Sequence, residues 1–265
     1  MSNKVVLITG ASGGIGAGMA RLFAQQGASV AVHYRTRKAG ASTVVDEIRT
    51  AGGRAEKFYA DLRSETAINR LVSEVVASFG KIDCLINNAG TVLKSYLDDT
   101  SADLWDDTLN INLRAPHLLS RAVLPHLHDG GSVIHNTSIH AKNSVPNFGV
   151  YAASKAGLES LAKVQALEWA ARGIRVNCIA PGVVPVERTM EALQAVRDDW
   201  MPHIPSGRYG DVEDIAEMAL WLASERAAWV TGQSFVVDGG MTARIDMPRR
   251  ARMPTPAGPD LIDGE

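Results

Sequence analysis

Short apolar runs rich in β-branched residues alternate with amphipathic segments along most of the chain, and this alternation limits the possible folds more than any other feature. Seven runs have the length and composition of buried strands: residues 5–8, 29–34, 55–60, 82–87, 132–136, 174–180 and 234–238. The segments between them have helical spacing, and several end at the glycine that commonly follows a helix: Gly27, Gly52, Gly80 and Gly173. The expected fold class is therefore α/β, with a doubly wound parallel sheet of about seven strands and helices on both faces.

The length of the chain and the positions of its Pro and Gly residues indicate its domain organisation. One composition runs through residues 1–246 without a linker or repeat, and 265 residues suffice for one large α/β domain. Within it, residues 183–207 are bounded by Pro and Gly and have an amphipathic middle, which indicates a substrate lid. Residues 247–265 form a tail rich in Pro, Arg and Gly, and both a disordered end and an arm that packs on a neighbouring subunit fit this composition.

Charge and cysteine usage exclude several classes of function. A formal net charge of −2 gives no indication of a nucleic-acid or membrane partner. No apolar stretch reaches membrane-spanning length, and the run before the first glycine-rich stretch is too short for a signal peptide. Cys84 and Cys178 lie in apolar runs without metal or redox spacing, as expected of buried thiols in a reducing compartment. We expect a cytoplasmic location.

The first predicted strand runs directly into the glycine-rich stretch TGASGGIG, residues 9–16. Its glycines stand where a strand-to-helix turn lets the backbone approach a pyrophosphate, with the N–H groups of the helix facing it. The spacing is G-x-x-x-G-x-G rather than G-x-G-x-x-G, and glycine-rich turns also serve as plain connectors. The position after the first strand of a βαβ unit favours a nucleotide site.

The stretch HYRTR, residues 33–37, ends the second predicted strand and indicates which nucleotide binds. An acidic residue here would bind a ribose 2′-hydroxyl, but the stretch contains none. Arg35, with Arg37 as a second candidate, can instead form a charge-assisted hydrogen bond with a 2′-phosphate. Two solvated loop arginines would look the same, but beside the glycine-rich loop they favour NADP(H) over NAD(H) as the cofactor.

Tyr151 and Lys155 stand four residues apart in a segment with helical spacing, GVYAASKAGLESLAKVQALEWA. Residues i and i+4 share one face of a helix, so the phenol and the ammonium would lie within reach of each other. A cation held there stabilises the phenolate and lowers the pKa of the phenol, which makes tyrosine a usable acid–base group. Ordinary surface pairs have the same spacing, so this interpretation depends on the rest of the chain.

Six motifs occur in order along the chain: TGASGGIG (9–16), NNAG (87–90), NINL (110–113), NTS (136–138), YAASK (151–155) and APG (180–182). With these motifs, residues 3–246 resemble the classical short-chain dehydrogenase/reductase family. The resemblance implies a Rossmann-like fold and an enzyme that transfers a hydride between a nicotinamide cofactor and a CH–OH carbon. It also favours a catalytic role for the Tyr151–Lys155 pair over a surface role.

The resemblance also implies the roles of the catalytic residues. Tyr151 resembles the general acid and base of the family, and Lys155 would lower its pKa and bind the nicotinamide ribose. Ser138 would hold and polarise the substrate oxygen. Asn112 resembles the asparagine that keeps a water in the proton path; Asn110 is the competing choice, but the asparagine of the family directly precedes the leucine of this motif.

The expected cofactor site shows one departure from the family. A threonine often follows the PG dipeptide by four residues, but Pro185 and Val186 fill this stretch and the first threonine is Thr189, which we leave out. The predicted cofactor-binding residues are Gly10, Ser12, Gly14, Ile15, Gly16, Tyr34, Arg35, Asp61, Leu62, Asn88, Ala89, Gly90, Tyr151, Lys155, Pro181, Gly182 and Val184.

Residues 139–148 and the lid would line the substrate site in this fold. Each candidate there is equally compatible with an ordinary loop or core role: His140, Asn143, Phe148, Trp200 and His203. We take Ser138, His140 and Tyr151 as the substrate set. The segments SIH, WLASERAAWVTG and DGGMT resemble bacterial glucose 1-dehydrogenases and, nearly as well, 3-oxoacyl-carrier-protein reductases. The expected substrate is a small secondary alcohol or ketone of the sugar or polyol type, with a 3-oxoacyl thioester as the alternative.

Two further points concern class and assembly. A non-catalytic dinucleotide sensor would share the fold, but it has no need of the intact set Ser138, Tyr151 and Lys155.

The helical segments 101–128 and 151–172 are apolar on more than one face, so they need a partner beyond the sheet. Together with the resemblance, this implies a homotetramer. His126 and His128 are spaced like a metal pair without a third ligand, and we expect no metal.

Overall fold

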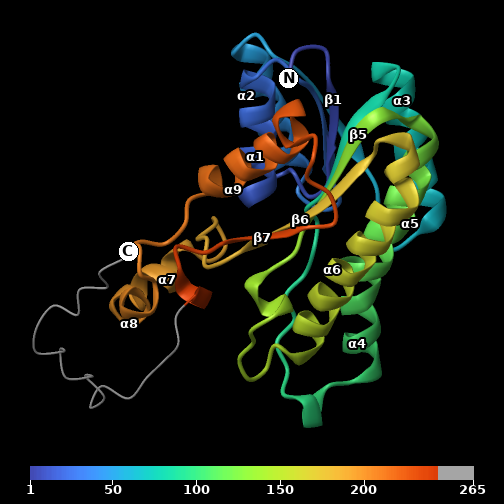
Figure 1. The fold of residues 1–265 in the computed structure, drawn as a ribbon. Helices are drawn as coiled ribbons and strands as arrows, with labels where there is room; N and C mark the ends of the chain where they lie inside the picture. Colours follow the sequence, from blue (N-terminus) through green and yellow to red (C-terminus); the bar gives the residue numbers. More distant parts are fainter. Residues whose placement is uncertain (244–265) are drawn as a thin grey trace, which may run out of the picture.

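A computed structural model describes residues 1–243 of the chain, and the predicted tail (247–265) lies outside the described residues. The sheet contains seven parallel strands in the order β3-β2-β1-β4-β5-β6-β7 (Figure 1). The strands are β1 (Val5–Ile8), β2 (Ser29–Tyr34), β3 (Arg54–Tyr59), β4 (Ile82–Asn87), β5 (Leu127–Asn136), β6 (Arg175–Pro181) and β7 (Ser234–Val237). The predicted single-domain, doubly wound α/β fold is confirmed.

The strand bounds agree closely with the sequence because most of these strands are buried on both faces. Every residue of β1, β4 and β6 is buried, as their largely apolar character predicts, although β4 and β6 each contain two polar or charged residues. The clearest difference is β5, which starts at Leu127 rather than at residue 132. Leu127 pairs with Ile82 of β4 across an irregularity in the register, and the polar residues that follow it hide this start from a search for apolar runs.

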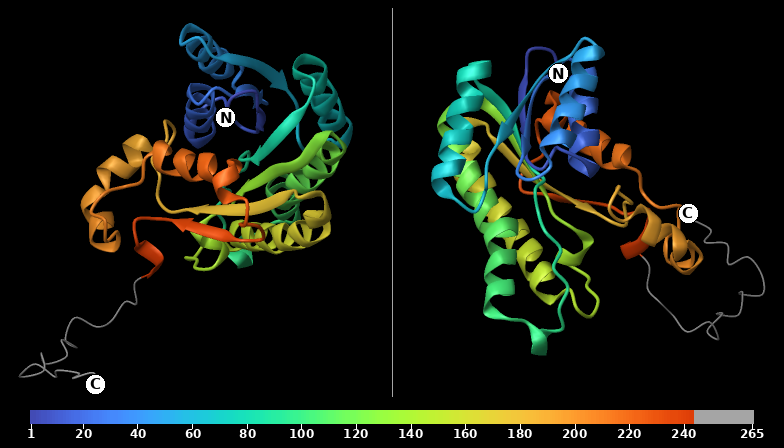
Figure 2. Two further views of the ribbon diagram at one scale, coloured as in Figure 1. Left: turned by 45° about the horizontal axis from the view of Figure 1, so that its top comes forward. Right: turned by 180° about the vertical axis from the view of Figure 1, so that it is seen from behind.

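Helices cover both faces of the sheet, as the views in Figures 1 and 2 show. The core on one face is filled from α1, α2 and α9, with Phe23 and Ile215 among its fully buried members. The core on the other face is filled from α3, α5 and α6, with Leu71 and Leu119 among its buried members. The helices are α1 (Gly14–Gln25), α2 (Lys38–Thr50), α3 (Glu65–Phe79), α4 (Ala102–Leu109), α5 (Ala115–Val123), α6 (Gly149–Trp169), α7 (Met190–Ala195), α8 (Arg197–Trp200) and α9 (Val212–Ala223).

The predicted helical segment 101–128 is divided in the structure. A π-helical turn, Asn110–Arg114, joins α4 to α5, and a 3-10 turn, Leu124–His126, leads into β5. Pro116 in the first turn of α5 has no N–H to donate to the carbonyl of Asn112, so the regular α-helical bond is missing at this point. The wider turn lies at the level of the pocket described below.

The glycines predicted to end helices all have positive φ, which confirms their function as stop signals. Gly80, with φ of 84°, is the left-handed C-cap of α3 and donates its N–H to the carbonyl of Val76. At the other end of this helix, the hydroxyl of Ser64 accepts a hydrogen bond from the N–H of Ala67.

The strand order defines where a ligand can bind. The chain reverses direction across the sheet between β1 and β4, so the loops that follow these two strands diverge and leave a crevice at their carboxyl ends. Within residues 1–243, no helix is long and apolar enough to cross a membrane.

Candidate active site

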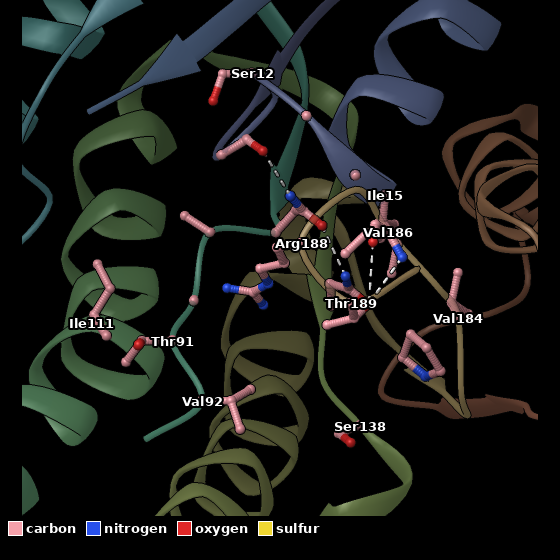
Figure 3. A pocket seen from close by; sticks show the side chains of 18 of the residues that line it. Ser12, Ile15, Thr91, Val92, Ile111, Ser138, Val184, Val186, Arg188 and Thr189 are labelled. Atoms are coloured by element: carbon pink, nitrogen blue, oxygen red, sulfur yellow. Dashed lines mark hydrogen bonds between the residues drawn. The ribbon is translucent and has the colours of Figure 1, made fainter. Parts of the chain in front are cut away.

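One pocket, of about 510 Å³, opens at the carboxyl edge of the sheet. Figure 3 looks into it, with Ser12 at one end and Ser138 at the other. It brings together segments that are far apart in the sequence, from the glycine-rich loop to the first turn of α6. The predicted residues that line it are Gly10, Ser12, Gly14, Ile15, Arg35, Leu62, Asn88, Ala89, Gly90, Ser138, His140, Tyr151, Lys155, Pro181, Gly182 and Val184.

The glycine-rich loop needs its glycines for conformation and for close packing. Gly10 has φ of 64°, a region that side chains disfavour. A Cβ atom at Gly16 would lie 2.5 Å from Nδ2 of Asn88 and 2.6 Å from the carbonyl oxygen of Gly10. Asn88 also donates from Nδ2 to the carbonyl of Thr9 at 2.9 Å. The loop is thus held in place by β4 and passes into the N-terminus of α1.

His33, which the sequence analysis did not select, supports this loop from β2. Its Nδ1 accepts a hydrogen bond from the N–H of Gly10 at 3.1 Å, and its Nε2 lies 3.1 Å from the carbonyl oxygen of Ala60. Nδ1 must therefore be unprotonated and Nε2 must carry the proton. Burial lowers the pKa of His33 to about 4, although Ala60 and Asp61 act in the opposite direction. The neutral ring fixes the loop relative to the end of β3.

The loop end of the pocket has the chemistry of a phosphate site. The N–H of Gly14 points outward at the start of α1, and Arg35 and Arg37 line the same region. Asp61 pairs with Arg63 at 2.7 Å, which lowers the pKa of its carboxyl to about 2, whereas the carboxylate of Glu187 accepts a hydrogen bond from the N–H of Gly14 itself. This donor set fits the phosphates of a dinucleotide.

Tyr151 and Lys155 lie at the opposite end, on the first two turns of α6. Nζ of Lys155 donates to the carbonyl oxygen of Asn136 at 2.8 Å and lies 5.7 Å from the ring centre of Tyr151. Lys155 is only 5% exposed, and burial lowers the pKa of its ammonium to about 8. The predicted i, i+4 pair therefore shares one face of a helix and projects into the pocket.

The electrostatics of Tyr151 differ from the expectation that Lys155 lowers the pKa of the phenol. Burial raises the pKa of Tyr151, and a hydrogen bond with Ser138 and the charge of Arg188 counteract this in part. Desolvation disfavours the phenolate more than the neighbouring groups favour it. The phenol is therefore protonated at neutral pH and can act as a proton donor.

Asn112 is buried behind the pocket rather than on its surface. Its Oδ1 accepts from the N–H of Thr91 at 2.8 Å, and its Nδ2 donates to the carbonyl of Thr91 at 2.9 Å and to the hydroxyl of Ser154 at 3.1 Å. These bonds join the π-helical turn to the segment after β4 and to α6. Asn112 is thus a structural link between the elements that carry Gly90 and Lys155.

The wall near Tyr151 is aromatic. The rings of His140 and Phe148 stack with centres 4.6 Å apart, and both meet the Tyr151 ring edge-on at about 6 Å. Lys94 lies over the outer face of Phe148 at 5.0 Å. This wall offers a flat, largely apolar surface next to the phenol of Tyr151.

Some predicted residues lie outside the pocket lining. Gly16 packs beneath the loop, Tyr34 is buried in the core beside Tyr59, and the carboxylate of Asp61 binds Arg63. Conversely, Thr189, which we left out, lines the pocket, and its hydroxyl bonds the backbone of Val186. The residues of the lining that sequence reasoning missed are Gly13, His33, Thr36, Ala60, Thr91, Val92, Ile111, Asn136, Thr137, Val186, Glu187 and Arg188.

A signal for part of this missed set was present in the sequence. Residues 186–188 lie a few positions after the APG motif (180–182), within the predicted lid, and contain two opposite charges, Glu187 and Arg188. Throughout residues 1–243, no group of three or more His, Cys, Asp and Glu side chains is placed to hold a metal ion. His126 and His128 belong to no such group.

Known proteins share this fold and these motifs along most of the chain. Residues 10–242 match a family model described as enoyl-(acyl carrier protein) reductase. The chain is 40% identical over 247 residues to 3β-hydroxysteroid dehydrogenase 1 of Eggerthella lenta, covering 91% of this chain and 95% of that protein. It is 36% identical over 241 residues to the 3-oxoacyl-[acyl-carrier-protein] reductase FabG of Staphylococcus epidermidis, with coverages of 90% and 99%.

Solved structures agree with these relatives. A blue fluorescent protein from a metagenomic library, in complex with NADPH, matches with a TM-score of 0.86 and 34% identity, covering 91% of this chain and 98% of that one. Other matched structures are described as short-chain dehydrogenases/reductases.

A Rossmann-like sheet with a dinucleotide cradle at its switch point and a Tyr–Lys pair beside it defines a class of nicotinamide-dependent oxidoreductases. The chain belongs to the short-chain dehydrogenase/reductase family. It is an oxidoreductase that acts on hydroxyl and carbonyl carbons.

Proposed function

We propose that this chain is an NADP(H)-dependent oxidoreductase that interconverts a secondary alcohol and a ketone, with Ser138, Tyr151 and Lys155 as its catalytic groups. The observation that carries the proposal is that these three residues line the same pocket as the glycine-rich loop. A protein that only senses a dinucleotide needs no phenol and ammonium at the far end of the site, so this observation favours an enzyme.

The proposed roles are those that the resemblance to the family implies, and the position of the three residues in one pocket supports them. Tyr151 gives a proton from its phenol oxygen to the substrate oxygen in reduction and takes it back in oxidation. Ser138 donates a hydrogen bond to the same oxygen and stabilises the charge that develops on it. Lys155, held by the carbonyl of Asn136, presents its remaining N–H groups to the ribose of the cofactor. When bound, the nicotinamide supplies or accepts the hydride.

Asn112 remains the candidate for holding a water in the proton path to Lys155. Its side chain is already hydrogen-bonded to Thr91 and Ser154, so any water would bind its backbone carbonyl. Pro116 leaves this carbonyl without the N–H that a regular helix would offer it. The π-helical turn therefore supports the choice of Asn112 over Asn110.

The preference for NADP(H) rests on the end of β2. Residues 33–37 contain no acidic side chain that would repel a 2′-phosphate, and Arg35 and Arg37 line the pocket there. The NADPH complex of a protein with the same fold is consistent with this preference.

We propose that the substrate is a sugar or polyol, with a 3-oxoacyl thioester as the second candidate substrate. The flat wall of His140 and Phe148 suits a ring-shaped substrate whose oxygen lies against Tyr151. The FabG relative favours the thioester, and the hydroxysteroid dehydrogenase relative adds a steroid to the compounds worth testing.

The functional test is nicotinamide absorbance with purified protein, using NADPH and NADH against ketones and 3-oxoacyl thioesters, and NADP⁺ and NAD⁺ against sugars, polyols and hydroxysteroids. We expect turnover that favours the phosphorylated cofactor.

Replacing Arg35 with Gln should raise the KM for NADPH about tenfold, because one charge-assisted hydrogen bond is lost, and leave the KM for NADH unchanged. Equal use of both cofactors by the wild type would refute the NADP(H) preference. Binding of cofactor without turnover of any compound would favour the sensor.

We also propose that the enzyme is a cytoplasmic homotetramer. Val164 and Leu167 on α6 are 47% and 79% exposed, an apolar surface that a neighbouring subunit would cover. Cys84 and Cys178 are buried free thiols, in agreement with a reducing compartment. Sedimentation equilibrium should give four times the 28.3 kDa mass of one chain; the mass of a monomer would contradict the tetramer.

A further inference from the structure

Glu187 places a carboxylate at the N-terminus of α1, where a phosphate of the cofactor would bind. Its two oxygens lie 3.2 and 3.1 Å from the backbone nitrogen of Gly14, which donates to them, although the two residues are separated by 173 positions. The start of a helix attracts anions because its N–H groups are free and its dipole is positive there. The chain thus supplies its own anion to this site.

Arg37 is drawn into the same contact. Its Nη1 lies 3.8 Å from a carboxylate oxygen of Glu187. The guanidinium crosses Gly13 so closely that a Cβ atom at this position would lie 2.3 Å from Nη1. Two of the groups that could hold a phosphate here, the N–H of Gly14 and the cation of Arg37, therefore already have a partner.

The turn that carries Glu187 is well defined. The carbonyl of Val186 accepts hydrogen bonds from the N–H groups of Thr189 and Met190 at 2.7 and 2.9 Å, and the Thr189 hydroxyl bonds the N–H of Val186 at 3.1 Å. Figure 3 shows Val186 and Thr189 side by side near Ile15 of the glycine-rich loop. A Cβ atom at Gly14 would lie 3.1 Å from Cγ1 of Val186, so the turn rests directly on the loop.

We infer that Glu187 is a specificity-determining residue of the cofactor site, which competes with the cofactor phosphates for Gly14 and Arg37. The inference rests on the proposed function. The carboxylate and a phosphate cannot occupy one N–H group together, and they repel each other at close range. Glu187 must therefore leave the loop before a phosphate binds there.

The competition affects the two cofactors unequally. Displacement of Glu187 frees Arg37, which lies beside the end of β2 and can then pair with a 2′-phosphate. NADPH carries this group and NADH does not. Removing the charge of Glu187 should therefore strengthen the binding of NADPH more than that of NADH.

The experiment measures dissociation constants of NADPH and NADH by nicotinamide fluorescence, using the full chain as wild type, as Glu187→Gln and as Glu191→Gln. Glu191→Gln is the matched control, since it removes the same charge from the next helix and no described hydrogen bond or ion pair joins Glu191 to the glycine-rich loop. We expect Glu187→Gln to bind NADPH roughly three- to tenfold more tightly, because the amide can keep only an uncharged hydrogen bond in place of the stronger charged one, and Glu191→Gln to match the wild type.

A second variant tests the part played by Arg37. Arg37→Gln should weaken NADPH binding little in the wild type, where Glu187 holds the guanidinium, and several-fold more in the Glu187→Gln background. Unchanged or weaker NADPH binding by Glu187→Gln, with wild-type binding intact, would refute the competition and leave the proposed function standing. No binding of either nucleotide by any form would overturn both. Equal unfolding midpoints of the variants establish that the fold is preserved.

Discussion

Replacing Tyr151 with Phe is expected to lower the kcat for ketone reduction by about 10²–10⁴-fold, the usual contribution of a positioned general acid. The ring would keep its edge contacts with His140 and Phe148, so only the hydroxyl is removed. Binding of NADPH should change little, because the phosphate end of the pocket is built from other elements. Steady-state kinetics together with a nicotinamide fluorescence titration separate these two effects.

The matched control is Tyr59→Phe, which removes a phenol hydroxyl from a tyrosine that is 49% exposed and lies outside the pocket. It should retain the activity of the wild type. If Tyr151→Phe retained full turnover, the proton-transfer role would have to be given to another group. If it lost activity and cofactor binding together, a structural defect rather than lost chemistry would explain the result.

The pH dependence gives an independent readout of the same group. Because burial raises the pKa of Tyr151, the phenol is protonated throughout the neutral range and can act as an acid. Ketone reduction should therefore be insensitive to the ionisation of Tyr151 near pH 7 and fall only in alkaline solution. Alcohol oxidation, which needs the phenolate, should rise as the pH increases. A fall of oxidation with rising pH below the pKa of Lys155 would contradict this assignment.

The fold was largely predictable because the signals for it are local. A strand such as β1 is buried along its whole length, and this appears in the sequence as an uninterrupted apolar run. Glycines at helix ends are also local signals, because each one is required by the backbone conformation at its own position. The π-helical turn at Asn110–Arg114 was missed because the helical spacing continues through both of its flanks, and only Pro116 marks the break.

The candidate site was predictable where a motif fixed a residue type and not where two distant segments meet. Tyr151, Lys155 and Ser138 were found because their spacing follows a known pattern. His33 was missed because its bonds join three separate strands, and the contact of Glu187 with Gly14 depends on how a loop after β6 folds back onto α1. The direction of the pKa shift of Tyr151 could not be predicted from the sequence either, because it depends on how deeply the phenol is buried.

Replacing Lys155 with Met is the other change with a large expected effect, a decrease in kcat/KM of about 10²–10³-fold, comparable to the loss of one preorganised electrostatic group. The methionine side chain fills similar space but cannot donate to the carbonyl of Asn136 or present N–H groups to a ribose. The loss should therefore include weaker cofactor binding as well as slower chemistry. Kinetics with cofactor as the varied substrate measure both.

Lys163→Met is the control for this change, because Lys163 lies two turns further along α6 and is exposed. The pH profile adds a readout that a structural defect would not produce. Burial lowers the pKa of Lys155 to about 8, so its positive charge is present below this pH and is lost as the pH rises through it. The wild type should lose cofactor affinity through this range, whereas Lys155→Met, which has no charge to lose there, should not. An identical pH dependence of cofactor affinity in both proteins would show that the ammonium of Lys155 does not hold the cofactor.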